Sequence, residues 1–265
     1  RHKGPDRSFV MTYSKIYSHP LAIEPFQVDF TGHMFPGVLG NHMLGAAGIH
    51  ADQRGFGIGR LNSEGSDGYT WVLSRLVIQM NGEWPASGAQ ININTWIDGV
   101  QKLFTSRCFD ITGSDGTVYG YARSIWAMIN LRTRKPEDLM SVGSGTLPEY
   151  IDTERPCPCS RGTRFRITAT EPVDKVTMRF SDLDINRHVN SFKYIDHILN
   201  LFTPDYHDTH RLSFLEVAFV SESHYGDEMH LYRDHCPDTE AYNIEVRHAS
   251  GETACRAHLE FTDRQ

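Results

Sequence analysis

Residues 73–88 read LSRLVIQMNGEWPASG, and residues 212–227 read LSFLEVAFVSESHYGD. Both stretches open on Leu-Ser, continue as an apolar run typical of a strand, and end in a polar segment that contains glycine. A second pair of stretches lies upstream of these, VDFTGHM from Val28 and LDINRHV from Leu183. Two pairs in the same order indicate an internal repeat, which predicts that one structural unit occurs twice in the chain.

Each half of the sequence contains a helix followed by several strands. Residues 34–54 carry small and apolar side chains on one face and end at Gly55 and Gly57, which predicts a helix. Residues 189–202 show a single apolar stripe and precede Pro204, which predicts a second helix. Strand patterns occur at residues 69–81, 90–99, 102–112 and 117–131 in the first half and at 176–180, 211–223, 228–235, 240–250 and 252–263 in the second.

The last strands of the two halves also correspond. Residues 121–130, YARSIWAMIN, align with residues 253–262, TACRAHLEFT, and a turn at Asp115-Gly116 matches one at Ser250-Gly251. Each helix has one apolar stripe that a curved antiparallel sheet can cover. The repeated order therefore predicts an α+β protein, built from two half-barrels that pack together as a pseudo-dimer.

Residues 132–172 break this pattern. The segment is rich in proline, glycine and charged residues and has little strand periodicity, so we expect it to cross the surface as a linker. The predicted organisation is an N-terminal unit over residues 11–131, the linker over residues 132–172, and a C-terminal unit over residues 173–265.

Composition limits the class of protein. The chain has 265 residues, of which 39% are hydrophobic and 22% are charged, as is usual for a globular protein. It contains no long unbroken apolar run, so no membrane segment is expected. The formal net charge of −7 argues against nucleic acid as a partner.

The N-terminus and the cysteines bear on the cellular compartment. The first residues contain no apolar signal-peptide core, and we expect Met11 to be the natural start, with residues 1–10 added to it. Five cysteines without the spacing of a disulfide framework fit a reducing cytoplasm. Cys157 and Cys159 could form a metal or redox pair. Because no second ligand pair stands at zinc spacing, two free thiols are the better interpretation.

A polar cluster stands directly before the second predicted helix. Asp184, Asn186 and His188 are spaced by two residues, which would place their side chains on one side of an extended segment. Backbone N–H groups at the helix start could stabilise a developing oxyanion. The alternative is that Asp184, Asn186 or Asn190 only caps the helix. The spacing alone leaves both interpretations open.

Longer stretches carry a family resemblance. Residues 179–199, RFSDLDINRHVNSFKYIDHIL, resemble the signature of the acyl-[acyl carrier protein] thioesterases of plants and bacteria, including its D-x-N-x-H core. Residues 68–88 and 122–136 resemble two characteristic strands of that family, and the match runs from Ile16 to Thr262. The resemblance implies a double hotdog fold, two tandem antiparallel sheets that each wrap a helix. It also implies hydrolysis of the thioester between a fatty acyl chain and its carrier protein.

The resemblance further implies an acidic residue on the strand after the second helix, which falls on Glu222. The plant enzymes commonly carry a cysteine after this acid, and here the position is Ser223. A cysteine nucleophile at that position is therefore impossible. A serine nucleophile would need an activating base nearby, so direct hydrolysis by water is the preferred expectation.

Our hypothesis assigns a role to each of the four residues. Glu222 is expected to act as the general base in a partly apolar cleft, although Asp184 could exchange roles with it. His188 would hydrogen-bond the water or the substrate, and Asn186 would orient the water or the thioester carbonyl. Asp184 would hold Asn186 and His188 in place. No cofactor and no metal are expected for this reaction.

The first half contains a degenerate copy of these residues. Asp29, Thr31 and His33 align with the D-x-N-x-H core, and Glu83 aligns with Glu222, although short strings can also match by chance. We expect the first half to shape the acyl tunnel and not to catalyse hydrolysis. Candidate tunnel residues, each of which could equally be ordinary core, are Val38, Met43, Ala46, Ala47, Trp71, Leu73, Trp96, Ile125 and Trp126.

The expected partner, the acyl carrier protein, is acidic and should dock on a basic patch. Two clusters could form one, although either could be solvated linker charge: Arg132, Arg134 and Lys135, and Arg161, Arg164 and Arg166. Two other functions stay open, an acyl-coenzyme A thioesterase on the same fold and an acyl-binding protein without activity. The sequence decides neither the preferred chain length nor whether the chain forms a homodimer.

Overall fold

The computed structural model describes residues 13–264 except 63–67, 161 and 163. The expected start at Met11 lies outside the described residues, as does Arg161 of the second basic cluster. None of the helices in the described part of the chain has the length and apolarity needed to cross a membrane.

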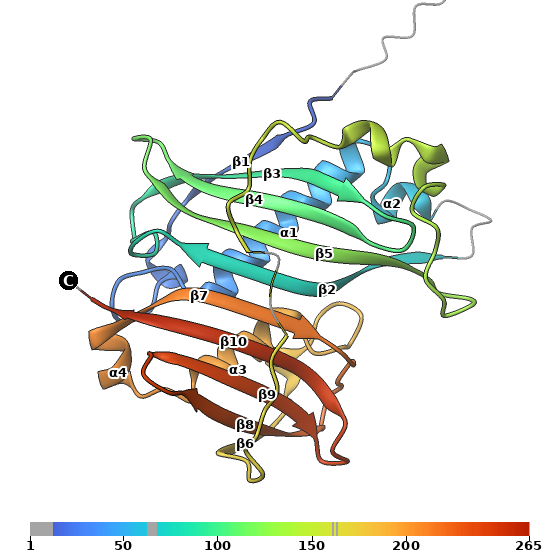
Figure 1. The fold of residues 1–265 in the computed structure, drawn as a ribbon. Helices are drawn as coiled ribbons and strands as arrows, with labels where there is room; N and C mark the ends of the chain where they lie inside the picture. The colour runs from blue at the N-terminus through green and yellow to red at the C-terminus, as the bar shows by residue number, and fades with distance from the viewer. Residues whose placement is uncertain (1–12, 63–67, 161, 163, 265) are drawn as a thin grey trace, which may run out of the picture.

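One ten-stranded antiparallel sheet forms the body of the molecule, and it curves around two helices on one of its faces (Figure 1). The strand order is β1-β3-β4-β5-β2-β7-β10-β9-β8-β6, so five strands of the first half meet five of the second at β2 and β7. The sheet therefore confirms the α+β double hotdog fold, with the two predicted sheets joined edge to edge. The strands are β1 (Tyr17–Ala22), β2 (Tyr69–Met80), β3 (Gln90–Val100), β4 (Thr105–Gly113), β5 (Val118–Asn130), β6 (Asp174–Thr177), β7 (His210–Phe219), β8 (Glu228–Cys236), β9 (Ala241–His248) and β10 (Thr253–Asp263).

Both predicted long helices are present, but the second is shorter than predicted. The helices are α1 (Pro36–Gln53), α2 (Ile58–Leu61), α3 (Ser191–Leu199) and α4 (Pro204–Thr209), with short 3₁₀ turns at Pro25–Gln27, Val142–Gly145, Leu147–Tyr150 and Phe180–Asp182. Helix α3 begins after a cap at Asn190 and ends at Leu199, so the residues on either side of it in the predicted range 189–202 are not helical. The sequence did not reveal β1, α2 or α4.

The two halves are related by a pseudo-twofold axis where β2 pairs with β7. Val77 pairs with Glu216, and these residues occupy the same position in the two repeated stretches. A β-bulge interrupts β2 at Ser74 and β7 at Ser213, again at the same position of the repeat. The alignment of residues 73–88 with 212–227 is therefore correct along the strands, and the duplicated unit is a structural repeat.

The alignment of the last strands is wrong by three residues. The first residue of each repeated stretch, Leu73 or Leu212, pairs with Trp126 in β5 and with Phe261 in β10. Trp126 therefore corresponds to Phe261, whereas the string alignment placed it on His258. An odd shift exchanges the two faces of a strand, and short apolar strings cannot fix the register without the partner strand.

Part of the segment 132–172 is buried. Leu139, Val142 and Leu147 pack with Phe56 and Ile97 in a small second core at one end of the first half. The expectation of a linker that only crosses the surface therefore does not hold for these residues.

Helices α1 and α3 approach closely at a glycine. A Cβ atom on Gly40 would lie 1.9 Å from Cε1 of Phe192, so only glycine lets the ring pack against α1 at this point. This contact sets the start of α3 beside α1, which positions the polar cluster that precedes α3.

Candidate active site

The segment with Asp184, Asn186 and His188 is a tight turn, not the predicted extended strand. The Asp184 N–H donates to the His188 carbonyl at 2.8 Å, and the Asp184 carboxylate accepts the N–H groups of Asn186 (2.8 Å) and His188 (3.1 Å). Arg187 has a positive φ of 65° in this turn. The Asp184 carboxylate therefore fixes the backbone beneath Asn186 and His188, because an aspartate can accept such bonds from the residues that follow it.

His188 and Glu222 come together at the end of this turn. His188 Nε2 lies 3.6 Å from Glu222 Oε2, with 33% and 49% of the two side chains exposed. Glu222 is thus half exposed and not enclosed in the expected apolar cleft. Two other groups lie near the pair: Arg134 Nη2 is 4.0 Å from Glu222 Oε2, and the His224 ring packs edge-on against the His188 ring.

Ser223 points the opposite way from Glu222. Its side chain is fully buried, accepts a hydrogen bond from the Tyr194 hydroxyl at 2.6 Å, and lies 3.5 Å from His248 Nε2. Burial raises the pKa of the Tyr194 hydroxyl, with neighbouring Ser223 opposing the shift. The segment beyond β7 thus turns one residue toward His188 and the next into the core.

The start of helix α3 is capped by Asn190. Its side-chain oxygen accepts the Phe192 N–H at 2.8 Å, and its amide lies 3.4 Å from Asn41 on α1. The capping alternative is therefore correct for Asn190. The Asn186 side chain is exposed and makes no hydrogen bond to another described residue, and the Ser191 N–H likewise meets no acceptor among them. Both groups remain available to a substrate.

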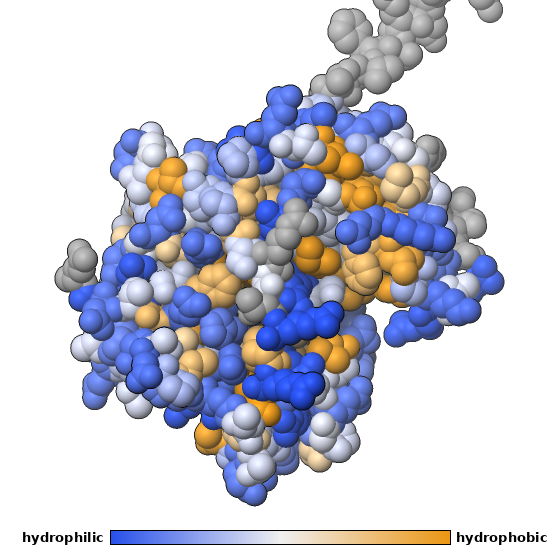
Figure 2. All heavy atoms as spheres, in the orientation of Figure 1, coloured by the Kyte–Doolittle hydropathy of each residue, from blue (hydrophilic) through white to orange (hydrophobic). Residues whose placement is uncertain are grey.

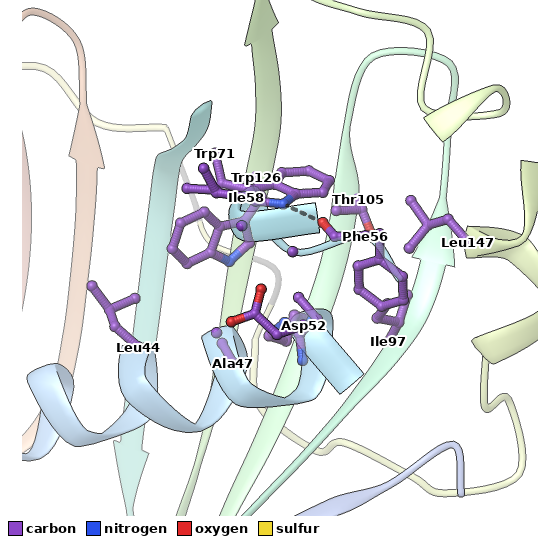
Figure 3. A pocket seen from close by; sticks show the side chains of 15 residues that line it. Leu44, Ala47, Asp52, Phe56, Ile58, Trp71, Ile97, Thr105, Trp126 and Leu147 are labelled. Atoms are coloured by element: carbon purple, nitrogen blue, oxygen red, sulfur yellow. Dashed lines mark hydrogen bonds between the residues drawn. The ribbon is translucent and has the colours of Figure 1, made fainter. Parts of the chain in front are cut away.

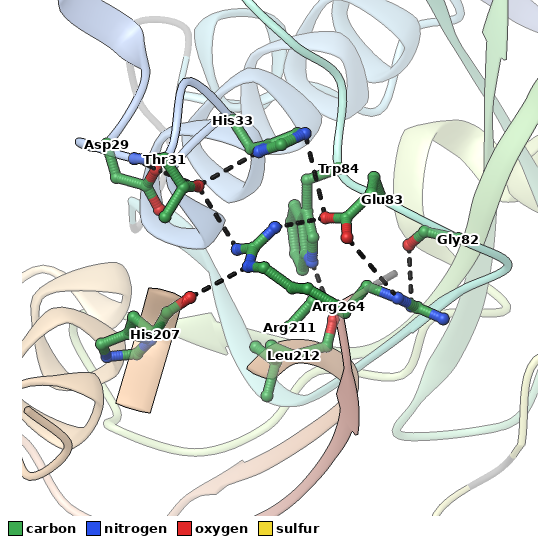
Figure 4. A network of polar contacts seen from close by, with 10 residues as sticks. All are labelled: Asp29, Thr31, His33, Gly82, Glu83, Trp84, His207, Arg211, Leu212 and Arg264. Carbon is green, nitrogen blue, oxygen red and sulfur yellow. Dashed lines mark hydrogen bonds and ion pairs between the residues drawn. The ribbon is translucent and has the colours of Figure 1, made fainter. Parts of the chain in front are cut away.

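The copy in the first half has the same backbone turn (Figure 4). The Asp29 N–H donates to the His33 carbonyl at 2.8 Å, and the Asp29 carboxylate accepts the Thr31 N–H at 2.8 Å. His33 Nε2 lies 3.8 Å from Glu83 Oε2, close to the separation of the other pair. The repeated geometry shows that the sequence match is no coincidence of short strings.

The surroundings of Glu83 differ from those of Glu222. Arg264 reaches between Thr31 and Glu83, with Nη1 2.5 Å from Glu83 Oε2, and Arg211 Nε lies 4.0 Å from Oε1 (Figure 4). The oxygens of Glu83 thus face two guanidinium groups, which leaves them less free to contact a water molecule. The copy is therefore geometrically intact but electrostatically neutralised.

A cavity of about 260 Å³ lies between α1 and the sheet of the first half. Figure 3 shows Ala47 and Asp52 on α1 facing Trp71 and Trp126. Buried Arg107 also lines it, and burial lowers the pKa of that guanidinium to about 9. Ala47, Trp71 and Trp126 are the predicted tunnel residues that line this cavity. Of the others, Met43, Ala46, Leu73 and Trp96 are buried core, whereas Val38 and Ile125 line other hollows.

The corresponding space in the second half is filled with aromatic rings. Phe202 aligns with Ala47 when the helix starts at Ser191 and Pro36 are matched. The Phe202 ring lies 4.8 Å from that of Phe261, the counterpart of Trp126, and 4.9 Å from that of Tyr242. Aromatic rings therefore occupy, in the second half, the position that borders the cavity in the first.

Sequence reasoning missed three side chains around the candidate site, namely Tyr194, His224 and His248. His224 had a visible signal, since it lies two residues after Glu222. Tyr194 and His248 had none, because they reach Ser223 from a helix and a distant strand. All five cysteines are free thiols, including Cys157 and Cys159.

Comparisons with known proteins agree on one family. The sequence profile of the acyl-ACP thioesterase N-terminal domain matches residues 14–141, and that of the C-terminal domain matches residues 167–263. The crystal structure of an acyl-ACP thioesterase from Bacteroides thetaiotaomicron superposes with a TM-score of 0.86 at 44% identity, over 94% of this chain and 98% of that one. The 12:0-ACP thioesterase from Umbellularia californica shares the fold, with a TM-score of 0.80 at 20% identity over 96% of this chain and 99% of that one.

Curated plant relatives indicate the same family. An acyl-[acyl-carrier-protein] hydrolase, FATB1, from Cuphea viscosissima is 29% identical over 66% of this chain and 42% of its own length. A second, FATB2, from the same plant is 26% identical over 78% of this chain and 52% of its own length. The chain thus spans about half the length of the curated relatives it matches. With both domain profiles in order along the sequence, the chain belongs to the acyl-ACP thioesterase family.

Proposed function

We propose that this protein hydrolyses the thioester of a fatty acyl-[acyl carrier protein] and releases the free fatty acid and the carrier. The observation that carries the proposal is the 3.6 Å approach of His188 to Glu222 beside the start of α3. The family membership supports it, because the plant relatives are named acyl-[acyl-carrier-protein] hydrolases.

Glu222 acts as the general base in this proposal. Its carboxylate takes a proton from a water molecule as the water oxygen attacks the thioester carbonyl carbon. His188, hydrogen-bonded to that water or to the substrate, keeps the reacting groups in line. Unlike Glu83, Glu222 has a single guanidinium nearby, that of exposed Arg134 at 4.0 Å, so the carboxylate stays free to accept the proton.

The oxyanion that forms is stabilised at the start of α3. The Ser191 N–H is the proposed donor, since it meets no acceptor among the described residues and lies at the positive end of a helix. The exposed amide of Asn186 orients the carbonyl or the water. Collapse of the intermediate expels the carrier thiolate, and the proton held by Glu222 returns to that sulfur.

Asp184 is a positioning residue in this proposal. Its carboxylate already accepts the backbone N–H groups of Asn186 and His188, so this side chain is engaged in holding the turn. These hydrogen bonds support assigning the role of base to Glu222 and not to Asp184.

The acyl chain is proposed to occupy the first half of the molecule. The open cavity there begins at Leu44, one helical turn beyond Asn41, which contacts the cap of α3. In the second half, the aromatic rings of Phe202, Tyr242 and Phe261 pack together at the matching position. A division into an N-terminal tunnel unit (11–131), a linker (132–172) and a C-terminal catalytic unit (173–265) remains our proposal.

The carrier protein is proposed to dock on Arg132, Arg134 and Lys135. All three are exposed, and Arg134 lies beside Glu222, so an acidic carrier bound there would present its thioester to the base. Arg164 and Arg166 of the second predicted cluster line a hollow together with Arg256. Figure 2 shows hydrophilic and hydrophobic side chains interspersed on this face of the molecule. The free thiols fit the proposed cytoplasmic location. A homodimer stays open.

The test compares the same acyl group attached to the acyl carrier protein and to coenzyme A. A series of acyl chain lengths is assayed as carrier-protein thioesters and as coenzyme A thioesters, with kcat/KM measured for each. The proposal expects higher values on the carrier at the best chain length. Equal or higher values on coenzyme A would make the protein an acyl-coenzyme A thioesterase, and retention of the acyl group without hydrolysis would make it a binding protein.

A further inference from the structure

We propose that His188, Glu222 and His224 form a binding site for a zinc-class divalent cation and that this cation reversibly inhibits the enzyme. One nitrogen of each imidazole and one carboxylate oxygen lie within 4.8 Å of one another. Two histidines and one carboxylate are a frequent ligand set for zinc in proteins.

The distances allow the three ligands to close on one ion. Tetrahedral zinc with ligand bonds of about 2.0–2.2 Å needs neighbouring ligand atoms about 3.3–3.6 Å apart. His188 Nε2 and Glu222 Oε2 already meet this requirement at 3.6 Å. His224 has 58% of its side chain exposed, so its ring can rotate the remaining distance without displacing core residues.

The carboxylate of Asp227 lies beside His224. Asp227 Oδ2 accepts the His224 backbone N–H at 2.9 Å and lies 4.0 Å from Nδ1 of the same ring. When the other ring nitrogen binds a metal, rotation of the ring can bring Nδ1 within hydrogen-bond reach of this carboxylate, a pairing that orients metal-bound histidines. The arrangement thus contains a partner outside the ligand set as well as the ligands.

The first half of the molecule provides an internal comparison. There the His33–Glu83 pair has almost the same geometry, but the residue that bridges to His33 is Ala86, whereas His224 bridges to His188. Glu83 is also held by Arg264, whose positive charge opposes a cation. The same fold therefore presents one site with three ligands, whose carboxylate has the exposed Arg134 at 4.0 Å, and one with two ligands, whose carboxylate Arg264 contacts directly.

Zinc at this site would stop hydrolysis, an effect that rests on the proposed function. A carboxylate coordinated to zinc cannot take the proton of the attacking water, and a coordinated His188 loses the nitrogen lone pair that faces Glu222. No metal takes part in the proposed reaction, so removal of zinc by a chelator restores full activity.

The experiment measures binding and inhibition separately. Binding of zinc alone is followed by calorimetry, and binding of cobalt(II) alone by its visible absorption, without substrate. Inhibition is measured as the zinc concentration that halves hydrolysis of an acyl-carrier thioester. The variant is His224→Ala, which leaves the proposed base in place. The matched control is His230→Ala, which removes a histidine paired with Glu228 at 2.7 Å elsewhere on the surface.

We expect His224→Ala to keep its zinc-free activity and to need about tenfold more zinc or more for both binding and inhibition, since losing a ligand weakens a metal site at least as much as losing its supporting residue. His230→Ala should match the wild type. Unchanged zinc affinity in His224→Ala, or undiminished hydrolysis when zinc saturates the site, would overturn the inference. Failure of the proposed function is distinguishable, because it appears as absent turnover of the acyl-carrier thioester by the zinc-free wild type, whereas zinc binding is measured without substrate.

Discussion

At the scale of single residues, the position of Ser223 separates two mechanisms. Its hydroxyl is buried and bonded to Tyr194, so it is not accessible to a thioester. Ser223→Ala should therefore keep turnover within about tenfold of the wild type, since a lost neutral hydrogen bond is worth only about 1 kcal/mol. Steady-state kinetics checks this. An acyl group trapped on Ser223 by rapid quench and mass spectrometry would contradict water attack.

For kcat, the side-chain oxygen of Asp184 that accepts hydrogen bonds should matter more than the negative charge of the carboxylate. Asp184→Asn keeps an oxygen that can accept the N–H groups of Asn186 and His188, whereas Asp184→Ala removes it. We expect a small loss of kcat in the amide variant and a much larger one in the alanine variant. Both variants are assayed with the same thioester after their folding is checked by circular dichroism. Equal, severe losses in both would return the role of base to Asp184.

The burial of His50 makes the free energy of unfolding depend on pH. Burial, with a smaller contribution from Arg107, lowers the pKa of this histidine to about 2, whereas in the unfolded chain it is about 6.5. Below pH 6.5 the unfolded protein binds a proton that the folded protein excludes, so the free energy of unfolding falls by about 1.4 kcal/mol per pH unit.

Urea unfolding at pH 7.5 and pH 5 tests the role of His50. The loss of unfolding free energy between the two should be smaller in His50→Gln than in the wild type by about 2 kcal/mol. Glutamine can still donate to the Lys15 carbonyl, which His50 contacts at 3.0 Å. An equal loss in both proteins would show that His50 titrates normally in the folded state.

At the scale of elements, helix α1 controls the space for the acyl chain. Ala47→Phe would copy Phe202 of the second half into the open cavity of the first. The ratio of kcat/KM on long to short acyl chains should fall about tenfold or more, because each methylene group kept out of the cavity forfeits about 0.8 kcal/mol.

A matched substitution on the same helix controls for size. Val38 lines a different hollow, so Val38→Phe should leave the chain-length profile unchanged. If both variants shift the profile alike, the chain does not run past Ala47.

The strands show which elements the sequence could predict. The apolar runs of β2 and β7 are the same repeated stretch, and their pairing across the pseudo-twofold axis follows from it. Which residues of β10 correspond to which residues of β5 could not be predicted, because the loops between strands differ in length. Only the pairing of β5 with Leu73 and of β10 with Leu212 fixes this correspondence. Strand β1 and helix α4 are short and lack a clear period, so their formation depends on packing.

At the scale of the whole molecule, duplication explains both the fold and the single candidate site. The turn before α3 was missed because alternate spacing suits a strand as well as a turn. Its positive φ falls on Arg187, whereas the copy has Gly32 there with a φ of 81°. Comparing the two halves at that position was the available signal. The neutralisation of Glu83 by Arg264 could not be predicted, since Arg264 is contributed from the far end of the chain.

The most direct measurement compares the two glutamates within one chain. Glu222→Gln and Glu83→Gln are assayed for kcat on the same acyl-carrier thioester, with thermal unfolding as a check on the fold. We expect Glu222→Gln to lower kcat by about 10²–10⁴-fold with little change in melting temperature. Glu83→Gln should keep kcat within a few-fold but melt earlier, because Arg264 and Arg211 lose their partner. Near-normal turnover in Glu222→Gln, or an equal loss in a folded Glu83→Gln, would contradict it.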